Sequence, residues 1–281
     1  NATFVGHLDG DHNDIIGLYL VQKSVPENWQ STGFIKNMAS GSSLSNINIR
    51  DAYISAGVNI DNSKADIGVL VGGIHGKTDI SISGCVIHDV LVKNNSAQVG
   101  ALIGRMWSNK RLVISNCATY DITIVGTPGA VGGIYSDGWD NWDAGLYTSK
   151  IENCFTSGLP ISHQDGSFRY TNVYTDINED YAFGNQRGYN SVYGGDGLYY
   201  MATDSMKGPD AVDNMKLKPN QWSPRTDDYP ECIILPYDYN GVPGEAWSGG
   251  KALTFAGGDG TQENPWQIDT AERFVKMLSD Y

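Results

Sequence analysis

The chain has 281 residues, of which 40% are hydrophobic and 18% are charged. This composition excludes a charged, disordered chain, and no apolar run approaches the ~18 residues that a membrane span requires. The net charge of −13 argues against binding to the phosphate backbone of a nucleic acid, which requires patches of Lys and Arg. We therefore expect one or two folded domains, no nucleic-acid partner and no insertion into a membrane.

The first motif with a chemical interpretation is the run of residues 9–14, Asp-Gly-Asp-His-Asn-Asp, which is similar to the first half of a calcium-binding loop. Such a loop has Gly at its sixth position and an acid at its twelfth, where this chain has Asp14 and Leu20. We therefore expect a solvated hairpin turn here, and we predict no metal ion or other cofactor for the chain.

Short sequence units recur through the middle of the chain. The pattern Ile, then Ser or Glu, then Asn or Gly, then Cys ends at Cys85, Cys117 and Cys154, with steps of 32 and 37 residues. Residues 44–47 and 170–173 have a similar form, with Ile or Val in place of the Cys. A period of about 20 to 50 residues indicates a solenoid, in which each unit packs on the next.

The repeated units have the local character of β-strands. The runs at 69–71, 80–82 and 90–92 are short and rich in β-branched residues, and Gly, Asn and Asp separate them. No helical stripe at i, i+3, i+4 and i+7 persists between residues 33 and 175. We therefore predict an all-β fold, a right-handed parallel β-helix with short capping helices, whose equivalent residues stack about 4.8 Å apart.

The repeated Cys position predicts a buried column. Exchange of Cys with Ile and Val at one position is what a small apolar side chain in a core allows. The long spacings argue against a metal site, while a disulfide between stacked neighbours is reachable but not needed. We expect Cys232, outside the column, to be a single buried thiol. The Gly-x-x-x-Gly segments at 68–72, 100–104 and 129–133 are expected to form tight corners between strands.

Two units resemble the GLUG repeat of bacterial cell-surface proteins, namely residues 68–74 with 82–85 and residues 99–104 with 114–117. That repeat is found ahead of the catalytic domain in immunoglobulin-A-cleaving peptidases and in surface proteins of gut and oral bacteria. The resemblance implies a β-helix that is extracellular or on the bacterial cell surface, and it implies no fixed chemistry. The sequence has no zinc-peptidase His-Glu-x-x-His motif, so peptidase activity is not carried over.

The resemblance extends to both ends of the chain. Residues 4–10 are similar to the entry strand of such β-helices, residues 203–208 look like part of the cap that closes them, and residues 255–261 look like the opening of a further unit. The implied domains are a β-helix (1–175), an irregular Tyr- and Gly-rich segment with a short capping helix (176–239), a linker (240–252) and a partial next unit or C-terminal cap helix (253–281).

The C-terminal segment ends in a predicted helix, at whose start Asp269 and Glu272 form a pair similar to a capping box. Three arrangements of residues 253–281 stay open. The chain was cut from a tandem array, or the segment caps a neighbouring chain head to tail, or it folds back on the first unit of its own chain.

The candidate ligand site follows the Gly-rich corners. If the units stack, the side chains at 75, 107, 139 and 142 project from one edge of the solenoid. Aromatic rings beside acids suit a sugar, because the ring covers the apolar face of the pyranose and the carboxylates bind its hydroxyls. The candidate ligand-binding residues are His75, Trp107, Tyr135, Trp139, Asp140 and Trp142. The alternative is that the Trp side chains pack their own loop onto the solenoid.

The same loop contains three acids, Asp137, Asp140 and Asp143, which are candidates for glycoside hydrolysis. That reaction needs two carboxyl groups about 5–9.5 Å apart across the sugar. Acids are also common in turns for backbone reasons, so we expect a binding module rather than an enzyme.

We predict a non-catalytic extracellular module of a bacterial surface protein, acting as an adhesin, a glycan-binding segment or a spacer. Its expected partner is a glycan or a host surface protein. One alternative is a β-helix glycosidase or lyase that uses residues 137–143. A second alternative is a structural subunit that associates with itself, head to tail, through residues 253–281.

Overall fold

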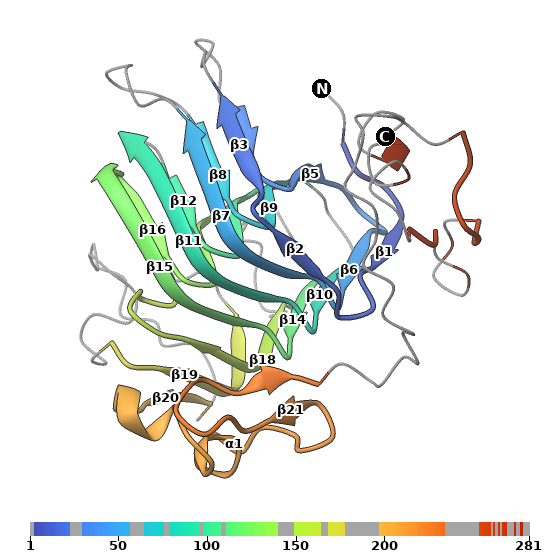
Figure 1. Ribbon diagram of the computed structural model, residues 1–281. Helices are drawn as coiled ribbons and strands as arrows, with labels where there is room; N and C mark the ends of the chain where they lie inside the picture. The colour runs from blue at the N-terminus through green and yellow to red at the C-terminus, as the bar shows by residue number, and fades with distance from the viewer. Residues whose placement is uncertain are drawn as a thin grey trace.

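The computed structural model describes residues 3–22, 30–56, 65–75, 79–95, 98–107, 111–139, 149–163, 168–177 and 197–233, and parts of the segment 253–277. Strands dominate these residues, and they pair in parallel apart from one short antiparallel pair (Figure 1). The predicted all-β class is therefore confirmed. In this part of the chain no helix is long and apolar enough to cross a membrane.

Three parallel sheets form the body of the molecule. The large sheet contains β1 (His7–Asp9), β2 (Asp14–Ile16), β3 (Tyr19–Gln22), β6 (Ser43–Ser45), β7 (Asn48–Ala56), β10 (Ile80–Ser83), β11 (Val86–Asn95), β14 (Leu112–Ser115), β15 (Ala118–Thr127), β18 (Lys150–Thr156), β19 (Arg169–Thr175) and β20 (Leu198–Tyr200). The β8 sheet contains β4 (Gln30–Thr32), β8 (Ala65–Gly68), β12 (Gln98–Gly100) and β16 (Ala130–Gly132). The β9 sheet contains β5 (Ile35–Met38), β9 (Val71–His75), β13 (Ile103–Trp107) and β17 (Tyr135–Trp139).

The chain passes through the three sheets in the same order in successive repeats. Strands β6 and β7 are followed by β8 and β9, β10 and β11 by β12 and β13, and β14 and β15 by β16 and β17. The last two of these repeats are paired with a constant register, as Gln98 with Ala130 and Ile103 with Tyr135. The paired residues are separated in the sequence by the same number of positions as Cys85 and Cys117. The period of the sequence is therefore the offset between paired strands.

The corner before each Cys position explains why Asn or Gly recurs there. The backbone at this corner is left-handed, with φ between 51° and 64°, a region that Gly and Asn tolerate best. A second left-handed column interrupts the pairing inside the long strands β7, β11 and β15 and bends them. The corner residues are Asn46, Gly84, Asn116, Asn153 and Asn172, and the second column is Asp51, Asp89 and Asp121.

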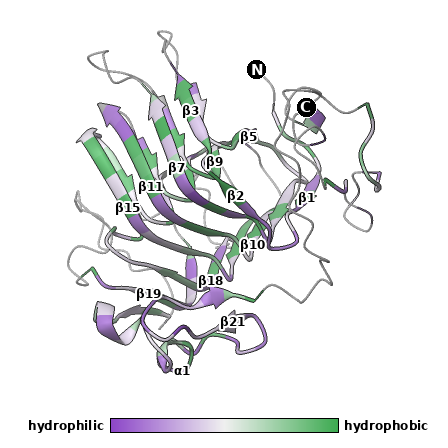
Figure 2. Cartoon of the chain, viewed as in Figure 1, coloured by the Kyte–Doolittle hydropathy of each residue, from purple (hydrophilic) through white to green (hydrophobic). Residues whose placement is uncertain are grey.

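The repeated Cys side chains form the predicted column in the main core. Cys85, Cys117 and Cys154 are fully buried free thiols, and the backbone N of Cys117 donates to Cys154 Sγ at 3.4 Å. Burial raises the pKa of the Cys85 and Cys117 thiols well above the usual value, so both stay protonated. Val173, the partner of Cys154 in the next strand, is buried too. Hydrophobic and hydrophilic residues alternate along strands of the large sheet (Figure 2). This alternation is expected for a strand with one face in the core, because successive side chains point to opposite faces.

Glycine forms the turn between the β8 and β9 sheets and lets them approach closely. A Cβ on Gly68 would overlap the Val71 carbonyl oxygen, and one on Gly72 would lie 2.6 Å from the backbone N of Thr32 in β4. The third Gly-x-x-x-Gly segment, 129–133, is out of register with the other two. Gly132 is the partner of Gly100, because the sheet keeps the register that also pairs Gln98 with Ala130.

A small lobe, residues 203–233, covers part of the large sheet (Figure 1). It contains a 3-10 turn, η2 (Thr203–Ser205), the short helix α1 (Ala211–Asn214) and the antiparallel pair β21 (Trp222–Ser223) and β22 (Glu231–Cys232). Its core residues Met206, Met215, Trp222 and Tyr229 pack on Val86, Tyr120, Phe155 and Tyr174, which alternate with the residues of the main core. The predicted cap therefore rests on the outer face of the large sheet. As predicted, Cys232 is a buried free thiol, and it lies in this lobe.

The C-terminal segment folds back on its own chain. Figure 1 shows described parts of the C-terminal segment near β1. Met277 is 3% exposed and belongs to the same buried cluster as Phe4 and Leu8, while Phe255 and Ile268 pack partly buried against it. The described residues of this segment therefore pack on the core of their own chain.

Candidate functional site

The predicted aromatic edge is a single register position at the end of the β9 sheet. Trp107, the last residue of β13, pairs with His75 in β9 on one side and with Trp139 in β17 on the other. His75 is exposed. We call this set of three positions the aromatic row. Trp142, Asp140 and Asp143 lie outside the described residues.

Tyr135 does not belong to this edge. It pairs with Ile103, is fully buried, and its hydroxyl lies 3.3 Å from that of Tyr170. Its ring centroid is 5.2 Å from that of Phe168. Tyr135 occupies a core position of its strand, so the structure removes it from the predicted ligand-binding residues.

A second row of positions lies two residues before the aromatic row in each strand of the β9 sheet. In the middle of this row Arg105 pairs with Gly73 on one side and with Asp137 on the other. Arg105 is only 6% exposed, whereas the neighbouring Met106 belongs to the main core. Asp137, a candidate acid, therefore stands in register beside a buried cation.

Polar side chains gather over Gly73, where the β8 and β9 sheets meet. A Cβ on Gly73 would lie 2.5 Å from Ser31 Oγ, 3.1 Å from Asn37 Oδ1 and 3.1 Å from His75 Nε2. Strand β9 lies against β4, which carries Ser31, so the contact joins two repeats. We call Ser31, Asn37, Gly73 and His75 the polar seam. A side chain at position 73 would displace these three polar groups, so Gly73 lets them lie close to the backbone here.

Opposite charges lie on neighbouring strands next to the polar seam. Asp66 in β8 is 2% exposed, and β8 lies against β13, which carries Arg105. Burial of a charge is tolerated when an opposite charge compensates it. Partial desolvation of the His75 ring by the atoms packed around it and, to a smaller extent, the charge of Arg105 lower the pKa of this exposed side chain. His75 is therefore neutral near pH 7, with one ring nitrogen that donates and one that accepts a hydrogen bond.

Ser31 and Asn37 were not predicted as site residues. They belong to the first repeat. The offset between paired residues of this repeat and the next, as in Thr32 and Ile67, is longer than the offset between the two repeats that follow. The adjacent glycines 72 and 73 were the feature of the sequence that could have indicated this seam. A second Gly directly after the corner indicates that other atoms approach the backbone closely at that residue.

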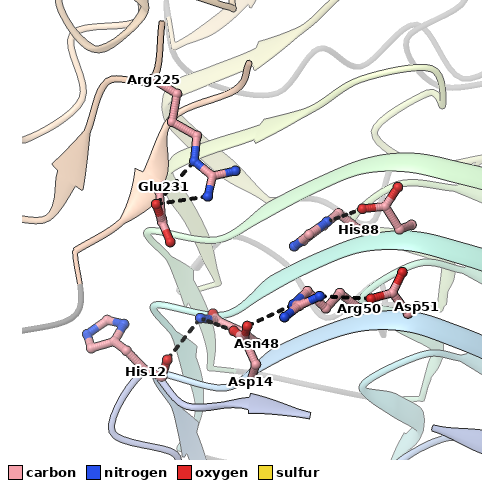
Figure 3. Close-up of polar contacts among 9 residues, drawn as sticks. His12, Asp14, Asn48, Arg50, Asp51, His88, Arg225 and Glu231 are labelled. Atoms are coloured by element: carbon pink, nitrogen blue, oxygen red, sulfur yellow. Dashed lines mark hydrogen bonds and ion pairs between the residues drawn. The ribbon is translucent and has the colours of Figure 1, made fainter. Parts of the chain in front are cut away.

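Ion pairs occupy a different surface, the outer face of the large sheet near the lobe (Figure 3). Arg50 is 2.8 Å from both Asp14 and Asp51, and His88 Nδ1 is 2.6 Å from Asp89 Oδ2. Arg225 of the lobe is 3.1 Å from Glu231. Pairs of this kind near the surface contribute little free energy, about 0–1 kcal/mol each, and Arg50 and Arg225 already have acids beside them.

Among the described residues, no three His, Cys, Asp or Glu side chains come together in a way that could hold a metal ion. Comparison with known proteins finds no matching family model, no matching curated protein and no matching solved structure.

Proposed function

We propose that the stacked sheets are the coils of a right-handed parallel β-helix with GLUG-like repeats, and that the chain is a non-catalytic glycan-binding module of a bacterial surface protein. The constant order of the strands and their repeated register support the β-helix. The resemblance of the repeats supports the location outside the cell or on its surface.

The aromatic row is the observation that carries the binding proposal. Three neighbouring strands place His75, Trp107 and Trp139 at one register position, so that these residues follow each other along the stack about 4.8 Å apart. An elongated ligand can contact all three at once. In this proposal the two indole rings cover the apolar faces of sugar rings, and polar groups beside them bind the hydroxyls.

The groups next to the row fit a neutral, hydroxyl-rich ligand better than a strongly charged one. His75 is uncharged near pH 7 and can both donate and accept a hydrogen bond. Arg105 is buried beside strands that carry Asp66 and Asp137. Acids on the strands next to Arg105 make this edge a poorer match for a polyanionic ligand than for a neutral one.

A glycan-array screen with a turnover read-out tests the proposal. We expect binding without turnover, and loss of binding in the double variant Trp107→Ala/Trp139→Ala. Tyr19→Ala is the matched control, because Tyr19 is an aromatic residue that is 70% exposed on the large sheet, away from the row. Equal binding by the double variant and the control would reject the row as the site. Turnover would favour the glycosidase alternative at residues 137–143.

A further inference from the structure

The lobe covers one part of the outer face of the large sheet and leaves another part open. It packs on one outer residue from each of β11, β15, β18 and β19, namely Val86, Tyr120, Phe155 and Tyr174. Figure 1 shows β3 and the far ends of β7, β11 and β15 side by side, away from the lobe. We call six outward-facing residues of these strands the Tyr patch, namely Tyr19, Val21, Tyr53, Leu91, Lys93 and Val125.

Strand pairing holds the Tyr patch in two ranks. In the first rank Tyr53 lies between Tyr19 and Leu91. The second rank follows two residues later in each strand and contains Val21, Lys93 and Val125. In β7 and β11 the residue between the two ranks is fully buried in the main core. Because successive side chains point to opposite faces, both ranks face away from the core.

The Tyr patch is apolar and open to solvent. Tyr19 is 70% exposed, Val125 47% and Val21 40%, while Tyr53 and Leu91 are half-buried between them. Single exposed apolar residues are ordinary on a protein surface, whereas a contiguous set marks an interaction site. The chain's own cover of this face, the lobe, leaves the set exposed.

The covered part of the same face shows which groups it accepts. The Tyr229 ring of the lobe lies against Tyr120, with centroids 4.5 Å apart, and the Trp222 ring lies against Phe155, at 5.4 Å. Strand β15 belongs to both parts, because it carries Tyr120 under the lobe and Val125 in the Tyr patch. The patch thus continues a surface on which aromatic side chains of a protein segment already pack.

Lys93 is the one charged residue of the Tyr patch. Its Nζ lies 5.8 Å from the centroid of the Tyr53 ring, and among the described residues no acid forms an ion pair with it. Arg50 and Arg225, the arginines of Figure 3, each have a carboxylate within 3.1 Å. A cation without an acid beside it, on an apolar surface of a chain with net charge −13, complements a carboxylate of a partner.

The stacking of the two Tyr rings argues for a protein segment rather than a sugar. The Tyr19 and Tyr53 rings stack with centroids 5.0 Å apart and 15° between their planes, and Lys93 lies over the Tyr53 ring. Tyr53 therefore has a neighbour from each flanking strand, whereas a pyranose needs an open ring face. The ring edge that remains packs well against other aromatic and apolar side chains.

From these observations we infer that the Tyr patch docks an apolar, acidic segment of another protein. Aromatic and apolar side chains of the segment pack on Tyr19, Tyr53 and Leu91, and a carboxylate of the segment pairs with Lys93. The segment continues the cover that the lobe begins on this face. The inference is independent of the proposed glycan site, because the aromatic row lies on the β9 sheet.

Random peptides displayed on phage test the docking site. The library is selected on the unmodified chain, and the enriched peptides are synthesised and titrated into purified variants. We expect these peptides to combine aromatic residues with an acid, and Tyr53→Ala should weaken their binding at least about tenfold. Tyr200→Ala is the matched control, because Tyr200 is 50% exposed in β20 of the same sheet, and it should leave the affinity unchanged. If Tyr53→Ala does not fold, Tyr19→Ala gives the same test at a more exposed position.

Lys93→Glu tests the charge of the partner. It should weaken the acidic peptides about tenfold, and the same peptides with Lys in place of their acid should bind this variant better than the unmodified chain. The Trp107→Ala/Trp139→Ala variant should bind the peptides normally, which separates this site from the glycan site. Three results would overturn the inference: a library without enriched peptides, peptides that bind Tyr53→Ala and Lys93→Glu as tightly as the unmodified chain, or self-association of the unmodified chain that Lys93→Glu abolishes.

Discussion

Two positions of the repeat run along the stack, and they differ in chemistry. The Cys position has Cys in three repeats and Val in the next, all buried. The aromatic row has His75 in one strand and Trp107 and Trp139 in the next two. A core position must keep its size and polarity from one repeat to the next, because every rung packs against the same neighbours. The aromatic row changes from one strand to the next, and under the proposed function this variation is where specific recognition arises.

The largest expected effect is on the core position. Cys117→Asp places a carboxylate in the fully buried column and should lower the free energy of unfolding by several kcal/mol or prevent folding. Cys117→Val puts a residue there that the repeat already uses at 173, and should change the free energy by less than about 1.5 kcal/mol. Denaturant unfolding measures both. Similar losses for the two variants would contradict the packing explanation.

The turn between the β8 and β9 sheets comes next. Gly68→Ala pushes a methyl group into the Val71 carbonyl oxygen and should cost about 3 kcal/mol or more of stability. Gly17→Ala is the control, because Gly17 has φ +72° and no atom within 4 Å of an added Cβ. This variant should lower the free energy of unfolding by about 1–2 kcal/mol, because Ala is disfavoured in the left-handed conformation. If Gly17→Ala proves the more destabilising change, close approach is not the reason for Gly68.

A single acid, Asp176, adds hydrogen bonds to the apolar packing that attaches the lobe, and its expected effect is smaller. Asp176 accepts a hydrogen bond from Thr203 Oγ1 at 2.9 Å and from the backbone N of Gly158 at 2.8 Å, and it contacts the Ser157 hydroxyl. Asp176→Ala should lower the free energy of unfolding by about 1–3 kcal/mol, because these donors lose their acceptor. Hydrogen exchange should accelerate in residues 203–233 and stay unchanged at the Cys column. Faster exchange throughout the chain would contradict a local role.

The smallest effect concerns pH and His75. Because partial desolvation and the charge of Arg105 lower its pKa in the folded state, the unfolded chain binds the proton more readily. The contribution of His75 to stability is therefore complete above its usual pKa of about 6.5 and is lost as the pH falls below that value. His75→Gln should make the decline in stability on acidification shallower. A curve identical to that of the unmodified chain would show that His75 does not contribute.

Much of the stack could be predicted because one step, the distance from Cys85 to Cys117, governs both the sequence pattern and the pairing of neighbouring repeats. The alignment of His75 with Trp107 and Trp139 follows from that step alone. The prediction that Tyr135 binds a ligand was wrong. Side chains alternate between the two faces of a strand, and Tyr135 has the same position as Ile103, which faces the core.

The remaining features come from contacts that no local pattern encodes. The polar seam joins strands of different repeats, and Ser31 belongs to a repeat with a different spacing. The lobe has no periodicity, so its place on the outer face depends on the apolar side chains that β11, β15, β18 and β19 leave uncovered. Met277 belongs to the same buried cluster as Phe4 and Leu8, which lie at the opposite end of the sequence.

Titration of the best array ligand into single variants tests the comparison most directly. If the aromatic row is the recognition surface, Trp107→Ala weakens binding at least about tenfold and leaves the thermal midpoint unchanged, as expected for an aromatic binding residue outside the core. Cys117→Val should leave the affinity unchanged. Unchanged affinity in Trp107→Ala, or a lost fold in that variant, would contradict the assignment and make the row a part of the packing.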